Sequence, residues 1–600
     1  MVIPLAASRP RCWLRVLLAC LPLACSDSGM TRTDTATCLH EDREVCTCPD
    51  GSSTGVRSCQ PGSPPGTCQG CAGSATGGQP GGGGPGASGA SGSAGGAGIY
   101  GGSGYGGTVT PAGGTGGTDA VPTEACAEAA ALHSASGCDF WPTVTANPVA
   151  KIFDFAVVVT NPGAQTSEVV IARGGQSLAG AVVAPGAQQV LYLPWVEELK
   201  GAPPACLGLA PVDASIKLPE GAYHLTSTRP VEVVQFNAIE NVGTGGPPGK
   251  SWDDCFAEQA CSATCTSFTN EASRLRPSTA QGLAHRVVTQ RNIVQDDLNP
   301  STYTTLLSVT GIADGTQVSV RLPPGTATLP GPGLTAGTPG STIVFSVQRG
   351  EVVQLFSQGE SGDLSGSLIE ADRPIQVIAG ARCTVVPDAA TKACNHLEET
   401  MPPVEALGRH YLVTPPTAPS GSTSGHMVKL VGHIDGTALT YKGTPPASAP
   451  TTLNAGEVID LGLVKDAFAI EGSGPFLVGL MLPGGDAVVQ GGTGSILGDP
   501  ALSVAVPLEQ FRTSHTFHTP SSYDVSYADV LGPSGASLQL DGQPVTAPGT
   551  PVADTGYQLW RLPLTMSADG QHRIEASAPV GLQVMGYGEY NGYQYPGAAP

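Results

Sequence analysis

The chain has 600 residues, of which 82 are Gly and 53 are Pro, and only 13% are charged. A single hydrophobic core does not organise a chain of this length, so we expect several domains. The low charge and high Gly and Pro content favour short strands and turns over helices. The formal net charge of −21, without a Lys/Arg cluster after the N-terminus, argues against nucleic-acid binding, which needs a basic surface to neutralise phosphates.

The N-terminus has the composition of an export signal. Arg9, Arg11 and Arg15 precede the apolar run Val16–Ala24. A basic start, a short apolar core and a small residue before the cleavage point are typical of a secretory signal peptide, which we predict over residues 1–24. The apolar run is too short to cross a bilayer, which takes about 20 residues.

The end of this signal suggests an anchor. The sequence Leu-Pro-Leu-Ala-Cys at residues 21–25 resembles the lipobox of bacterial lipoproteins. The resemblance implies that Cys25 is acylated and becomes the new N-terminus. Because Ser26 rather than Asp follows it, the resemblance also implies sorting to the outer membrane. The alternative is ordinary cleavage, which leaves Cys25 as one more thiol.

The cysteines after Cys25 form two even sets, as a disulfide framework requires. Six lie in a short N-terminal module: Cys38, Cys46, Cys48, Cys59, Cys68 and Cys71. Eight lie in the main body: Cys126, Cys138, Cys206, Cys255, Cys261, Cys265, Cys383 and Cys394. Spacing favours the local bridges Cys126–Cys138 and Cys383–Cys394 and leaves the other pairings open. In an exported chain without nearby His, disulfides are favoured over zinc sites, so we expect no metal.

Two segments separate the signal from the main body. Residues 25–71 are too few to build much of a core, so disulfides must hold this module together. Residues 72–120 are nearly half Gly, with Ser, Ala, Thr and Pro making up most of the rest. Such a segment has nothing to bury, so we predict a disordered, flexible linker.

From residue 121 onward the pattern is that of an all-β protein. Short apolar runs with period-two alternation, such as 153–160, 317–322 and 427–431, are bounded by Gly, Pro, Asp and Asn. One stretch, Glu124–His133, is the best candidate for a short helix.

One motif occurs four times, as HLTSTRPVEVVQF, LIEADRPIQVIAG, AIEGSGPFLVGLM and RIEASAPVGLQVM. Each copy has Leu or Ile five residues before a proline and Val, Ile or Phe directly after it; the prolines are Pro230, Pro374, Pro475 and Pro579. Because proline cannot donate to a ladder, we expect one strand to end, a turn to follow, and a new strand to begin at the proline.

The repeats predict four tandem β-sandwich modules of Ig-like size, each about 100 residues long. We place them at residues 121–274, which include a Cys-rich excursion, and at 275–394, 395–499 and 500–600.

Several phrases resemble a known family. They are GCDFWPT (137–143), TSTRPVEVVQFN (226–237), TNEASRLRP (269–277), EADRPIQVIAG (370–380), HLEETMPPVEALGRHYLV (396–413) and GYGEYNGYQYPG (586–597). They resemble the IgG Fc-binding protein N-terminal domain family, whose bacterial members, many in myxobacteria, are often lipoproteins with a Cys-rich and Gly-rich N-terminal segment. The resemblance implies a noncatalytic binding or adhesion module, and the family offers no catalytic residues to transfer.

The residues themselves offer few signs of an enzyme. Residues 121–600 contain no GxSxG nucleophile motif. His515 and His518 stand three apart on an expected strand, so they point to opposite faces and cannot share a metal. Glu398, Glu399 and Glu405 cluster as glycosidase carboxyls could, but we favour a structural role for them.

Two further groups of residues are weak candidates for ligand binding. Asp253 with Asp254, and Asp297 with Asn299, lack the Gly and distal Glu of a calcium loop. The tyrosines near the C-terminus could stack on sugar rings, although closing the last sandwich is the favoured role; they are Tyr587, Tyr590, Tyr593 and Tyr595.

We therefore expect an exported surface lipoprotein, anchored in the outer membrane by its N-terminal lipid and without a cofactor. Its modules would bind or adhere to a glycan, a matrix component or a cell-surface protein. A structural spacer or assembly component of the cell surface is the first alternative, and a secreted hydrolase with an unrecognised site is the second.

Overall fold

The computed structural model describes residues 42–47, 54–59, 123–202, 210–255, 265–293, 304–359, 362–391, 394–488, 496–565 and 569–597. The expected signal peptide, the lipidation site Cys25 and the linker 72–120 lie outside these residues. So do six expected disulfide cysteines: Cys38, Cys48, Cys68, Cys71, Cys206 and Cys261. Among the described residues, no helix has the length and apolar character needed to cross a membrane.

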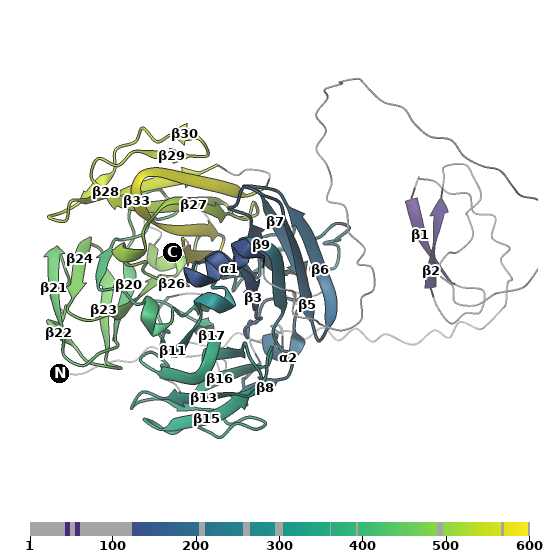
Figure 1. The fold of residues 1–600 in the computed structure, drawn as a ribbon, viewed down its shortest axis with the longest axis horizontal. Helices are drawn as coiled ribbons and strands as arrows, with labels where there is room; N and C mark the ends of the chain where they lie inside the picture. The colour runs from purple at the N-terminus through teal and green to yellow at the C-terminus, as the bar shows by residue number, and fades with distance from the viewer. Residues whose placement is uncertain are drawn as a thin grey trace, which may run out of the picture. The chain divides into compact units, whose positions relative to one another are not determined.

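The chain divides into two units, residues 1–102 and 103–600. In the first unit, β1 (Asp42–Thr47) and β2 (Thr54–Cys59) pair antiparallel, with Asp42 opposite Cys59 and Thr47 opposite Thr54. The second unit contains four β modules, which follow one another in chain order around a common centre (Figure 1).

Module 1 begins with the expected short helix, whose first turn is capped by Thr123. Its elements are α1 (Glu124–Ala131), β3 (Gly137–Phe140), β4 (Phe155–Thr160), β5 (Ser167–Arg173), β6 (Gln176–Val183), β7 (Gln188–Leu193), α2 (Glu197–Lys200), β8 (Ile216–Leu218), β9 (His224–Asn237) and β10 (Ala272–Leu275). Of these, β8 pairs with β16 of the next module.

Modules 2 and 3 repeat much of this order. Module 2 consists of η1 (Ser278–Ala280), β11 (Gly282–Arg286), β12 (Thr305–Gly311), β13 (Thr316–Arg321), β14 (Ala327–Thr328), β15 (Thr342–Val347), β16 (Val352–Gln358), β17 (Leu368–Thr384) and β18 (Asn395–Thr400). Module 3 consists of η3 (Val404–Ala406), β19 (His410–Val413), β20 (His426–Gly432), β21 (Thr437–Gly443), β22 (Thr452–Leu453), β23 (Val458–Val464), β24 (Phe468–Gly472), β25 (Phe476–Leu482), α4 (Gly485–Val488) and β26 (Ala501–Val504).

Module 4 consists of η4 (Leu508–Gln510), β27 (Arg512–His518), β28 (Val525–Pro533), β29 (Leu538–Leu540), β30 (Gln543–Pro544), β31 (Thr550–Val552), β32 (Tyr557–Leu564), β33 (Gln571–Gly588) and β34 (Asn591–Pro596). β18 pairs with β17 and β26 pairs with β25, so we assign these two strands to modules 2 and 3.

The proline motif forms a bend inside a strand, and the expected turn is found only in module 3. β9, β17 and β33 run through Pro230, Pro374 and Pro579, whereas β24 and β25 lie on either side of Pro475. In every module the part before the proline and the part after it pair with different strands. The proline stands where the partner strand changes, because its missing N–H is not needed there.

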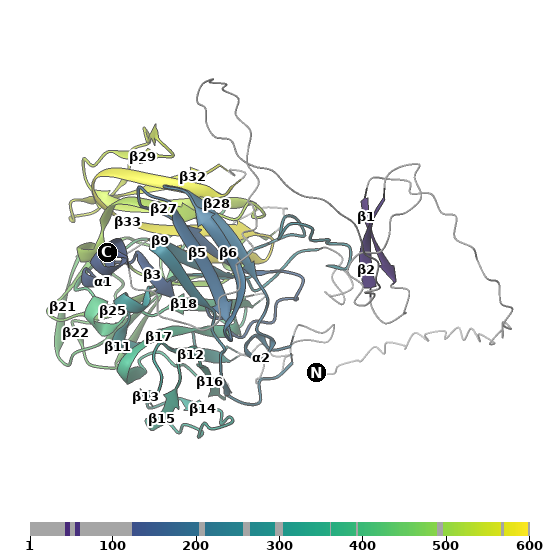
Figure 2. The ribbon, with the colours of Figure 1, turned by 45° about the vertical axis from the view of Figure 1, so that its right-hand side comes forward.

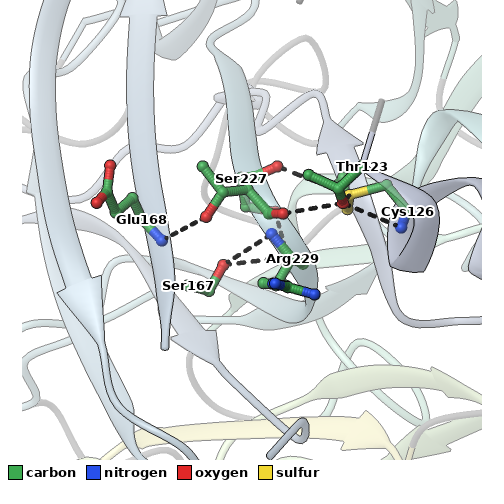
Figure 3. The surroundings of a disulfide bond; sticks show 8 residues. Thr123, Cys126, Ser167, Glu168, Ser227 and Arg229 are labelled. Atoms are coloured by element: carbon green, nitrogen blue, oxygen red, sulfur yellow. Dashed lines mark hydrogen bonds between the residues drawn. A yellow bond between two sulfur atoms is a disulfide. The ribbon is translucent and has the colours of Figure 1, made fainter. Parts of the chain in front are cut away.

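Side-chain hydroxyls satisfy the backbone at the bend of module 1 (Figure 3). The Ser167 hydroxyl donates to the carbonyl of Arg229 over 3.1 Å and accepts from its N–H over 3.2 Å. Thr123, at the cap of α1, donates to the carbonyl of Thr228 over 3.0 Å. The disulfide Cys126–Cys138 therefore anchors α1 beside a part of β9 that lacks ladder bonds.

Three disulfides are described, each closing a short loop. Cys126–Cys138 and Cys383–Cys394 are the two pairs that spacing favoured, and Cys255–Cys265 adds the pairing that the sequence left open. Their Cα–Cα distances of 5.8, 5.3 and 5.7 Å lie in the usual range.

The last strands of the modules close the ring at its centre. β10 lies beside β18, β18 beside β26, β26 beside β34, and β34 beside β10. The side-chain amide of Asn395 donates to the carbonyls of Asn270, Pro500 and Gly592 over 3.0, 2.6 and 3.2 Å. One residue at the start of β18 thus contacts the start of each other central strand. Figure 2 shows the modules after a turn of 45° about the vertical axis.

All four module junctions bury apolar side chains, so the modules form one body. Val352 of module 2 joins the core of module 1, and Met427 of module 3 joins the core of module 2. Tyr527 of module 4 packs with Leu482 of module 3, and Phe236 of module 1 packs with Tyr593 of module 4.

A glycine–proline contact recurs at three of these junctions. A glycine in or just before the first strand of one module lies against the proline that starts the 3-10 helix of the next. A Cβ on the glycine would lie 2.1–2.4 Å from the proline Cβ, so no larger residue fits without movement. The pairs are Gly137 with Pro277, Gly282 with Pro403, and Gly408 with Pro507.

Candidate functional site

The centre of the ring holds a buried polar network that no ligand reaches. Glu398 of β18 is 0% exposed and accepts hydrogen bonds from Thr145, Gln235 and Asn237 over 2.6, 2.9 and 3.1 Å. These contacts join the central strand of module 2 to module 1. The network therefore has a structural role.

Two neighbouring carboxyls belong to the same network. Glu271 accepts the backbone N–H groups of Ala272, Gln594 and Leu502 over 3.0, 3.0 and 2.8 Å, which joins three central strands. Glu399 accepts from the Thr400 N–H over 2.9 Å. Burial raises the pKa of Glu271 and of Glu399 well above the usual range.

The positions of Glu398, Glu399 and Glu405 show whether they could act as the paired carboxyls of a glycosidase. Glu398 and Glu399 are 0% and 1% exposed and lie in β18, not in a loop, whereas Glu405 lies in η3 beside Gly282. Substrate cannot approach the first two, so the three carboxyls do not form a glycosidase pair.

The two histidines of β27 are core residues. His515 Nε2 lies 2.9 Å from the carbonyl of Val580, and His518 Nδ1 lies 3.3 Å from Gln188 Oε1. Burial lowers the pKa of each to about 4, so both are neutral at physiological pH. Across the described part of the chain, no three His, Cys, Asp or Glu side chains gather as a metal site would require.

Three of the four C-terminal tyrosines pack in the interior. Tyr587, Tyr593 and Tyr595 are 2%, 0% and 0% exposed, and only Tyr590 is 36% exposed. The rings close module 4 and pack against Phe236 of module 1, which leaves no stacking platform for sugar rings. Asp253 and Asp254 lie in an exposed turn before Cys255, while Asp297 and Asn299 lie outside the described residues.

The best candidate for a ligand site is a cleft of about 830 Å³ between modules 2 and 3. We call it the arginine cleft. One wall comes from β11, β13 and the segments after them, and the other from the turn before β23; the lining residues used below are Arg286, Arg321, Asp363, Gly366, Gly456 and Glu457.

Strand register brings the two arginines to one face. Arg286 of β11 and Arg321 of β13 both lie opposite Leu368, on either side of β17. Residues opposite the same position share a face, and two strand spacings put their Cα atoms about 10 Å apart. Long arginine side chains at that separation can reach one anionic group from two sides.

The charge of these arginines is only partly offset. Arg286 is 3% exposed and donates to the carbonyl of Gly366 over 3.0 Å, while its Nε has no hydrogen-bond partner among the described residues. Burial lowers the pKa of Arg286, and so does the positive charge of Arg321; Glu370 and Asp435 oppose that shift. Such a group gains from a bound anion.

The acidic residues of the cleft are already occupied. Asp363 pairs with the Lys429 ammonium over 2.7 Å, and Glu457 accepts the N–H of Asn454 over 2.9 Å. Arg321 is exposed and forms no ion pair within the part of the chain that the structure describes. The exposed Arg321 guanidinium is therefore accessible to an anionic ligand, on a chain whose net charge is −21.

Sequence reasoning did not find this site, since Arg286 and Arg321 are 35 positions apart. The weak signal available was that each arginine is the last residue of a short strand, GLAHR or TQVSVR.

Comparisons with known proteins agree with the resemblance seen in the sequence. A family model described as IgGFc binding protein matches residues 271–586, slightly more than half of the chain. Human IgGFc-binding protein is 28% identical over 331 residues, which make up 54% of this chain and 6% of that protein. The chain thus corresponds to a small part of that relative. No solved structure matches the chain significantly.

Proposed function

Because the chain belongs to the IgGFc-binding protein family, we propose that it is an exported, noncatalytic binding protein that holds its ligand by an acidic group in the arginine cleft. The ligand class is a glycan, a matrix component or a cell-surface protein. The observation that carries the proposal is that Arg286 and Arg321 face one cleft and form no ion pair with a carboxylate among the described residues.

The proposal also includes the localisation of the protein. We infer an outer-membrane lipoprotein of the myxobacterial type, anchored through Cys25 and holding its modules away from the membrane on the linker 72–120. The lipobox-like residues 21–25 and the Gly-rich linker support this localisation. The three disulfides fit a protein that matures in an oxidising compartment.

Binding of the full, oxidised chain to an immobilised panel tests the function. The panel holds sulfated, uronic-acid and sialylated glycans, their neutral counterparts, and IgG Fc. We expect saturable binding to an anionic member and a loss of at least tenfold in affinity for Arg321→Ala. Arg573→Ala, which removes an exposed arginine elsewhere, is the matched control. Well-folded protein that binds nothing on the panel would favour the spacer alternative.

A further inference from the structure

A lysine and two carboxyls are enclosed together beside module 1. Asp154 directly precedes β4, and Glu240 and Lys250 follow β9. The Nζ of Lys250 lies 2.5 Å from Oδ2 of Asp154, and the two side chains are 10% and 21% exposed. The same Nζ donates to the carbonyl of Ile152 and lies 4.0 Å from the ring centroid of Trp252.

Glu240 is the third member of this group, which we call the Lys250 triad. Its Oε2 accepts the backbone N–H of Asp154 over 2.8 Å, and the residue is 4% exposed. Burial and the neighbouring Asp154 carboxyl raise the pKa of Glu240 to about 8. At neutral pH, Glu240 therefore holds a proton beside the other carboxyl.

One side of the triad is apolar. Phe153 and Trp252 pack with ring centroids 5.4 Å apart, and both belong to a small apolar cluster. A Cβ on Gly246 would lie 2.4 Å from Cδ of Lys250 and 3.4 Å from Oδ2 of Asp154, so glycine lets the backbone cover the pair. Burial favours a neutral amine and a neutral acid over two charges.

We propose that Lys250 and Asp154 condense to an intramolecular isopeptide bond, with Glu240 as the acid–base catalyst. The geometry brings together an amine, a carboxyl and a second buried carboxyl beside an apolar cluster. Nothing in this proposal depends on the arginine cleft.

The reaction balances without an oxidant or a further reactant. A proton first passes from the Lys250 ammonium to the Asp154 carboxylate, which gives a neutral amine and a neutral acid. The amine attacks Cγ of Asp154 while the Glu240 carboxyl donates a hydrogen bond to the carbonyl oxygen. Glu240 then takes a proton from the nitrogen and returns one to the leaving hydroxyl. The C–N bond forms, the C–OH bond breaks, and one water leaves.

A second buried lysine–aspartate pair provides an internal comparison. Lys429 lies 2.7 Å from Asp363, but the other side-chain partners of Asp363 are the hydroxyls of Thr289 and Ser365, with no second carboxyl among them. Burial tends to raise the pKa of Asp363, yet the Lys429 ammonium and these hydrogen bonds bring it below the usual range. This pair keeps its charges and stays an ion pair.

The bond would fix the segment after β9 to the start of β4. Cys255–Cys265 closes part of the same segment. An amide survives reducing conditions that open a disulfide, so the attachment would persist when Cys255–Cys265 is reduced.

Mass spectrometry of the full chain tests the proposal. After complete reduction and denaturation, we expect a mass lower by one water than that calculated for the same mature chain without the bond. Tryptic digestion should leave Lys250 uncleaved and yield one branched peptide that contains residues 154 and 250. Lys429→Arg, the matched control, should keep the deficit of one water.

Three variants examine the roles of the triad. Lys250→Arg and Asp154→Ala should restore the full mass because each lacks one reactant. Glu240→Gln keeps both reactants and should also show the full mass, with the disulfide Cys255–Cys265 intact as evidence of folding. Wild-type protein with that disulfide formed but with the full mass would overturn the proposal, whatever the variants do. A deficit retained in Glu240→Gln would overturn the role of Glu240.

Discussion

The centre of the ring and the arginine cleft differ in how their charged side chains are partnered. At the centre, Glu271 accepts three backbone N–H groups, and burial raises its pKa well above the usual range. In the cleft, the Nε of Arg286 has no hydrogen-bond partner among the described residues, and the exposed Arg321 lies beside it. Glu271 is satisfied by the protein and holds the fold together, whereas the exposed charge of Arg321 is available to a ligand.

Removal of the Glu271 side chain should give the largest loss of stability. Glu271→Ala leaves three N–H groups of different central strands without their acceptor. We expect the free energy of unfolding to fall by about 3–5 kcal/mol, measured by urea denaturation with disulfides intact. Glu220→Ala, at an exposed position, is the control. A loss below about 1 kcal/mol would show that the centre does not hold the ring together.

A methyl group at a module junction should have a smaller effect. In Gly282→Ala, the new Cβ would lie 2.4 Å from the Cβ of Pro403, so one module must shift against the next. We expect a loss of about 1–3 kcal/mol in the free energy of unfolding. Gly325→Ala adds the same methyl where no atom lies within 4 Å and should be nearly neutral. Equal effects at both positions would contradict the packed junction.

The free energy of unfolding should also depend on pH, because the interior keeps His515 neutral. Burial and the nearby Arg512 and Arg274 lower the pKa of His515 to about 4, against an ordinary value of 6.5. Between about pH 4 and pH 6.5, His515 is therefore protonated in the unfolded chain and neutral in the folded chain. The contribution of His515 to the free energy of unfolding is lost as pH falls through this range.

His515→Gln removes this titration. The slope of unfolding free energy against pH between about 4 and 6.5 should decrease by up to about 1.4 kcal/mol per pH unit relative to the wild type. His410→Gln, which alters an exposed histidine on the surface of module 3, should not produce that decrease. Parallel curves for wild type and His515→Gln would mean that His515 is not kept neutral.

The elements of the fold follow from local sequence, but their closure into a ring does not. Alternating apolar residues predict the strands, and Thr123 with the Ala-rich run after it predicts α1. The four prolines predict the repeat, yet a bend and a turn need the same residues, and only the pairing partners on each side distinguish them. Asn395 contacts three other central strands, and nothing in its own neighbourhood encodes those contacts.

The candidate sites could not be predicted from local sequence either, because their residues are far apart along the chain. Arg286 and Arg321 become neighbours only because β17 lies between their strands. The Lys250 triad gathers residues that are up to 96 positions apart. The carboxyl cluster at residues 398–405, which proximity in sequence did suggest, is divided between a buried strand and a 3-10 helix.

The most direct measurement of the central claim is the affinity of the full chain for its best anionic ligand from the panel, at low and at physiological salt. The arginine cleft predicts that binding weakens as salt rises, because the ligand is held by charge at an accessible site. It also predicts that Arg321→Glu, which reverses an exposed charge, abolishes binding while the free energy of unfolding stays within about 0.5 kcal/mol of the wild type. Equal affinity of wild type and Arg321→Glu for that ligand would contradict the account.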